Sequence, residues 1–196
     1  MPRTVADPDL LGVYLNDHLA GATGGLELAR RTAGSHRGGE TGAALKRIAD
    51  EIREDREALL AIMVKLGVPV RRYKVYAAWA AEKAGRLKLN GRLASPSPLS
   101  GLVELEMLRL GTEGKAAGWS TLRELADADA RLDARRLDEL IARARAQSRT
   151  LEELRVKAAA GAFTTSGPSA RDPEKQRAPG KQAAPEKRRD PRAPAK

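Results

Sequence analysis

The chain contains no cysteine, which excludes disulfides and thiol chemistry and is compatible with a reducing compartment. Aromatic residues are very scarce, at 3% of 196 residues, and with few β-branched residues there is little material for strands. The chain has no apolar run of roughly 18 residues, and its N-terminus lacks the apolar segment of a signal peptide. These absences predict an all-α protein that is cytoplasmic and makes no membrane contact.

Alanine, leucine, arginine and glutamate dominate what remains, and their apolar members recur at spacings of three and four residues. This periodicity predicts four long helices, at about residues 8–32, 41–66, 99–126 and 132–160. Asp7 followed by Pro8 provides a cap and a first turn for the first helix. Gly67 is typical of a helix end and predicts where the second helix stops.

The stretch 99–126 is the most informative part of the chain, because its predicted helix carries two distinct faces. One face combines leucines with charged side chains and includes Leu102, Leu110, Glu106, Arg109 and Glu113. The opposite face carries three glycines, each of which costs a helix about 0.8–1 kcal/mol relative to alanine. We expect these glycines to allow close approach of a neighbouring backbone, and hence a helix enclosed on both faces. They are Gly111, Gly114 and Gly118.

Residues 67–100 form a long, basic connection with a predicted short helix at 72–85 that holds Tyr73, Tyr76 and Trp79. Basic and aromatic residues together can bind phosphates and stack on bases, but the aromatics can equally pack the short helix onto the bundle. Residues 161–196 are rich in proline, alanine, lysine and arginine and predict a disordered basic tail. With the net charge of +10, this makes nucleic acid or another polyanion a candidate partner. The candidate polyanion-binding residues of the connection are Arg71, Arg72, Lys74, Lys83, Arg86, Lys88 and Arg92.

Four amphipathic helices with one long connection predict a four-helix bundle over residues 1–160. This layout resembles the ferritin-like fold, whose members often hold a di-iron centre built from glutamates and Glu-x-x-His motifs. The nearest segments here are Glu106-Met107-Leu108-Arg109 and Glu54-Asp55-Arg56-Glu57. Neither has histidine at its fourth position, and arginine cannot ligate a metal because it stays protonated. The resemblance therefore implies the architecture without the standard metal motif.

In that architecture the helices would bring one polar layer together, because counting 1.5 Å per residue places polar residues of all four helices at similar heights. One interpretation is a buried ion network, in which Arg56 and Arg109 bridge the carboxylates and Gln147 joins them. The other is a divalent site for Fe, Mn or Zn, since nitrogen and carboxylate ligands suit these ions. The sequence favours the network. The candidate metal ligands are His18, Asp55, Glu106 and Glu113.

No nucleophile motif or phosphate-binding glycine loop is present, which argues against an enzyme. The sequence predicts a non-enzymatic interaction protein, with a protein partner or self-association. The alternatives are a ferritin-like metal-binding protein with a His/carboxylate site and a weak nucleic-acid-associated protein acting through the basic connection and tail.

Overall fold

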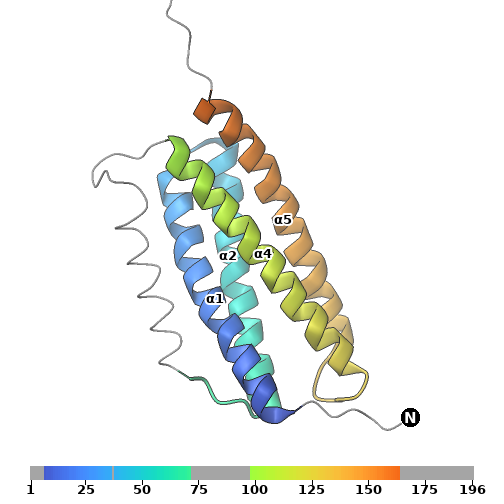
Figure 1. The fold of residues 1–196 in the computed structure, drawn as a ribbon. Helices are drawn as coiled ribbons and strands as arrows, with labels where there is room; N and C mark the ends of the chain where they lie inside the picture. Colours follow the sequence, from blue (N-terminus) through green and yellow to red (C-terminus); the bar gives the residue numbers. More distant parts are fainter. Residues whose placement is uncertain (1–6, 37, 72–97, 164–196) are drawn as a thin grey trace, which may run out of the picture. The chain divides into compact units, whose positions relative to one another are not determined.

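The computed structural model describes residues 7–36, 38–71 and 98–163, and these residues fold into helices without a strand (Figure 1). The prediction of an all-α chain with four long helices is confirmed. Most of the predicted connection and all of the predicted tail lie outside the described residues. The helices are α1 (Pro8–Ser35), α2 (Gly39–Leu66), α4 (Pro98–Ala126) and α5 (Ala134–Phe163).

Local capping explains where three of the helices begin or end. The Asp7 carboxylate accepts hydrogen bonds from the backbone N–H groups of Asp9 and Leu10, at 2.9 and 3.2 Å, which fixes the start of α1 as predicted. Gly67 ends α2 with φ of 72°, a left-handed conformation that glycine adopts without strain. α5 begins two residues later than predicted, because Asp133 caps it by accepting from the N–H of Arg136 at 3.0 Å.

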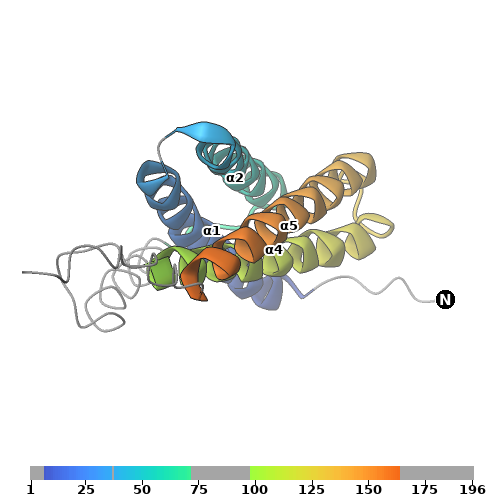
Figure 2. The same ribbon diagram turned by 90° about the horizontal axis from the view of Figure 1, so that it is seen from above.

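The helices form two antiparallel pairs, α1 with α2 and α4 with α5 (Figure 1). α1 and α5 run in one direction and α2 and α4 in the other, as the predicted layout requires. The pairs meet mainly where α1 packs against α4, whereas α2 and α5 touch over a short stretch and diverge beyond it (Figure 2). The result is a bundle that is more open between α2 and α5 than between α1 and α4.

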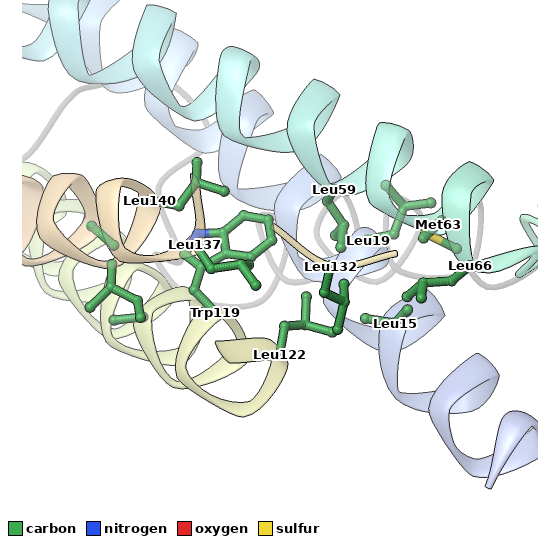
Figure 3. Close-up of a cluster of buried hydrophobic side chains, with 13 residues drawn as sticks. Leu15, Leu19, Leu59, Met63, Leu66, Trp119, Leu122, Leu132, Leu137 and Leu140 are labelled. Atoms are coloured by element: carbon green, nitrogen blue, oxygen red, sulfur yellow. The ribbon is translucent and has the colours of Figure 1, made fainter. Parts of the chain in front are cut away.

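Two apolar clusters make up the core, one towards each end of the bundle. The Trp119 cluster joins all four helices and the α4–α5 loop (Figure 3); its members include Leu15, Leu19, Leu59, Met63, Trp119, Leu122, Leu137 and Leu140. The Ile48 cluster lies towards the other end, with Leu26, Leu45, Ile48, Ile52, Leu105, Leu108, Leu151 and Leu154. Apart from the exposed Leu110, the residues between the two clusters in each helix are small or polar. The polar side chains inside the bundle are therefore concentrated in the layer between the two clusters, which we call the polar layer.

The buried face of α4 differs from the predicted one. Leu102 is buried as expected, but Leu110 is 61% exposed and Glu113 is exposed, whereas Leu105 and Trp119 are buried. The buried face is thus rotated by about a quarter turn around the helix axis from the face that the sequence indicated. The prediction was wrong because it centred the face on Leu102 and Leu110, and the second of these leucines faces away from the core.

Candidate functional site

The layer between the two clusters is centred on Asp55 of α2, whose side chain is almost completely buried. Its Oδ2 lies 2.5 Å from the Nζ of Lys115 on α4, and its Oδ1 lies 2.5 Å from Nη2 of Arg143 on α5. The second contact is an ion pair without hydrogen-bond alignment, since neither of its two atoms has a hydrogen-bond partner. One carboxylate therefore holds cations from two other helices, which links α2, α4 and α5.

Gln147 of α5 closes this network. Its Nε2 donates to Glu51 Oε2 at 2.8 Å and to Asp55 Oδ2 at 3.3 Å, and its Oε1 accepts from Lys115. Arg143 also pairs with Glu54, at 2.9 Å, on the outer side of α2. Asp55, Lys115 and Gln147 thus each hydrogen-bond to a side chain of another helix, which lowers the free-energy cost of burying them.

Burial lowers the pKa of the Lys115 ammonium below its ordinary value, and the attraction of Asp55 opposes that shift without cancelling it. The network therefore stabilises a buried Lys115 ammonium that would be strongly disfavoured in purely apolar surroundings. A buried ion pair of this kind contributes little net stability, but breaking it leaves an uncompensated charge. Its structural effect is to fix the register of three helices at this level.

Of the predicted network residues, Asp55 and Gln147 belong to the ion network around Asp55, and the two arginines do not. Arg56 contacts α1 instead, where its Nε donates to Thr23 Oγ1 at 3.0 Å. Arg109 pairs with Glu152 of α5 at 3.1 Å, so its expected bridges to Glu106 and Glu113 are not formed. Both arginines have partners different from those the sequence suggested.

Lys115, Arg143 and Glu51 are the network residues that sequence reasoning missed. Arg143 is four residues before Gln147 and therefore shares its helix face, so the spacing could have identified it. Lys115 lies on the glycine-bearing side of α4, whereas the sequence predicted buried charged side chains only on the opposite side. Its burial follows from the position of Asp55 on another helix, which no local pattern in α4 reveals.

The four predicted metal ligands are not brought together. Asp55 is occupied by Lys115 and Arg143, and Glu113 is exposed, where its Oε1 accepts from Ser148 Oγ at 2.5 Å. Glu106 and His18 are half-buried on different helices. Across the part of the chain that the structure describes, no group of three or more histidine and carboxylate side chains could hold a metal ion.

Arg71 is the one predicted polyanion-binding residue within the described ranges. Its backbone N–H donates to Asn16 Oδ1 at 2.6 Å, which attaches the end of the α2 segment to α1. The others lie outside the described residues: Arg72, Lys74, Lys83, Arg86, Lys88 and Arg92.

A cavity of about 430 Å³ adjoins the polar layer, between α1, α2 and α4. Its wall is predominantly apolar, and it is open to solvent where α1 and α4 contribute exposed residues. Apolar side chains of both core clusters line it, including Leu15, Ile52, Leu59, Leu108, Trp119 and Leu122. The volume lies within the range of about 300–1,000 Å³ that is usual for small-molecule sites.

Five glycines from α1 and α4 form much of the wall of this cavity, namely Gly21, Gly25, Gly111, Gly114 and Gly118. A methyl group added at any of the first four would meet no atom within 4 Å. At Gly118 it would lie 2.8 Å from Cε1 of His18. The prediction that the glycines of α4 admit a neighbouring backbone is therefore wrong: two of them face open space and the third faces an imidazole ring.

Polar side chains also reach the cavity wall, from α1 and from the polar layer. They are Asp17, His18, Asp55, Arg56 and Lys115. Burial lowers the pKa of His18 below its ordinary value of 6.5, and the negative charge of Asp17 opposes the shift only in part. The imidazole is therefore mostly neutral at pH 7. Its ring packs against the ring of Tyr14, with the centroids 4.5 Å apart.

Comparison of the chain with protein-family models, with curated proteins and with solved structures gives no match. Among the described helices, none is sufficiently long and apolar to cross a membrane.

Proposed function

We propose that this chain is a non-enzymatic, ferritin-like helical bundle that binds a small, mostly apolar molecule in the cavity between α1, α2 and α4. The observation that carries the proposal is the set of five glycines in the cavity wall. The order of helix directions supports the ferritin-like assignment, because the connection between α2 and α4 joins two helices that run in the same direction.

The glycines argue for a binding site because of what they cost and what they touch. Five glycines inside helices cost about 4–5 kcal/mol relative to alanine, against a typical total stability of about 5–15 kcal/mol. At four of the five positions a methyl group would contact nothing. What glycine supplies there is empty space beside an apolar wall, and an apolar ligand that fills this space would be stabilised by burial.

The polar layer supports the cavity from one side. Asp55 and Lys115 belong both to the ion network and to the cavity wall, so the network fixes α2 and α4 at the level where the cavity lies. In this proposal the polar layer has a structural role only. The predicted metal site and the predicted polyanion-binding surface stay predictions, which elemental analysis and nucleic-acid binding measurements would test.

The test is binding of the neutral fluorescent dye N-phenyl-1-naphthylamine to the full chain. We expect saturable binding with a rise in fluorescence, and a loss of at least about tenfold in affinity for Gly25→Leu, which places a side chain in the cavity. Gly24→Leu is the matched control, because Gly24 is the neighbouring residue, has the same open surroundings and does not line the cavity. Equal binding by both variants would contradict the proposal.

A further inference from the structure

We infer that the ligand of this cavity is an amphipathic carboxylic acid, and that Arg56 is the residue that selects its carboxylate. This inference rests on the proposed function, and it adds the chemical class of the ligand. It is carried by one cation of the cavity wall that has no carboxylate partner among the described residues, rather than by the cavity alone.

Arg56 is a half-buried cation in the cavity wall without an anionic partner. Its Nε donates to the neutral hydroxyl of Thr23 at 3.0 Å. Among the residues that the structure describes, no carboxylate lies within ion-pair distance of its guanidinium. The adjacent Asp55 does not serve this role, because Lys115 and Arg143 already engage both of its oxygens.

The donors left on Arg56 match one carboxylate. With Nε used by Thr23, the two terminal nitrogens remain, and a guanidinium presents such nitrogens as a planar fork suited to the two oxygens of a carboxylate. A phosphate monoester carries nearly two negative charges and would call for a second cation. The other cationic residue that lines the cavity, Lys115, already donates to Asp55 and Gln147.

The rest of the wall defines the other half of the ligand. Met107 and Leu108 of α4 face the same cavity as Ile52 and Leu59 of α2, and these four side chains offer no hydrogen bond to a polar ligand body. Trp119, which also lines the cavity, is the exception in having an indole N–H, which is buried without a partner. A straight or branched hydrocarbon body with one carboxylate is therefore the ligand class that fits both halves of the wall.

Three ten-carbon compounds that differ only in their head group test this inference: decanoate, 1-decanol and decylamine, each used to displace the bound naphthylamine dye from the full chain. We expect decanoate to bind at least about tenfold more tightly than decanol, and decylamine to bind more weakly than either. Arg56→Gln should remove the preference by lowering the affinity for decanoate at least about tenfold more than the affinity for decanol, and Arg56→Lys should keep part of the preference. Arg53→Gln is the control, because Arg53 pairs with Glu57 and does not line the cavity.

The outcomes separate the two levels of the account. If the dye does not bind, or none of the three compounds displaces it, the cavity is not a ligand site and the proposed function fails. If decanol displaces the dye as well as decanoate does, or decylamine binds best, the cavity function stands and the carboxylate inference is overturned. The same holds if decanoate is preferred and Arg56→Gln keeps that preference, since another residue would then select the head group.

Discussion

The wall glycines of α4 allow a prediction in which two identical substitutions, four residues apart, have different effects. Gly114→Ala adds a methyl group that meets no atom within 4 Å, so the helix propensity of alanine acts alone. We expect the free energy of unfolding to rise by about 0.8–1 kcal/mol. For a chain of this length that corresponds to an increase in Tm of about 2–4 °C.

Gly118→Ala adds the same methyl group where the imidazole of His18 is in the way. The new Cβ would lie 2.8 Å from Cε1 and 2.9 Å from Nδ1 of that ring, which is closer than such atoms approach. The ring is half-buried against Tyr14, and forcing it from its rotamer costs about 0.5–1.5 kcal/mol. We therefore expect Gly118→Ala to be about 1 kcal/mol less stable than Gly114→Ala.

Urea denaturation followed by far-UV circular dichroism measures both variants, and a double-mutant cycle identifies the cause. In a His18→Ala background the obstacle is gone, so Gly118→Ala should become as stabilising as Gly114→Ala. If Gly118→Ala already stabilises the native chain as much as Gly114→Ala does, the packing of His18 against α4 described above is refuted.

Three further predictions concern the polar layer, His18 and the predicted metal site. Asp55→Ala should lower the free energy of unfolding by about 3–5 kcal/mol in urea denaturation, because it removes the only ion-pair partner, among the described residues, of the largely buried Lys115 and one of the two partners of Arg143. Asp50→Ala on the exposed side of α2 should have no measurable effect. The lowered pKa of His18 means that the unfolded chain binds more protons between that pKa and 6.5. Stability should therefore fall as the pH is lowered through this window, and His18→Asn should reduce the slope of unfolding free energy against pH. Elemental analysis of protein purified without chelator should show no stoichiometric Fe, Mn or Zn, and near-stoichiometric metal that is lost in His18→Ala/Glu113→Ala would restore the metal-site alternative.

The helices could be predicted from the sequence because their ends are determined locally. Asp7 caps α1 and Gly67 ends α2 through interactions within one turn, so the residue types alone indicate them. The buried face of α4 could not be predicted in the same way. Leucines occur around much of that helix, and which of them is buried depends on where α1 and α5 pack, which is a property of the assembled bundle.

The candidate site could be predicted only in part. A polar layer containing Asp55 and Gln147 followed from counting helix rise, but its cations did not, because Lys115 is buried through a contact with another helix. The unusual number of glycines within the helices is visible in the sequence, but their role is not. Glycines within a helix are expected both where a neighbouring backbone packs closely and where a cavity lies beside the helix. Which of the two applies depends on the distance between α1 and α4 at this level, which the sequence does not give.

The most direct test of the cavity as a binding site uses the fluorescence of Trp119, which lies in its wall. The chain has two tryptophans, so Trp79→Phe leaves Trp119 as the single reporter. A decanol carrying a terminal bromine should quench this fluorescence with a saturable dependence on concentration. Adding Gly25→Leu should abolish the saturable quenching, and adding Gly24→Leu should not. Quenching that rises linearly without saturation, or that is the same in both variants, would contradict a ligand site in the cavity.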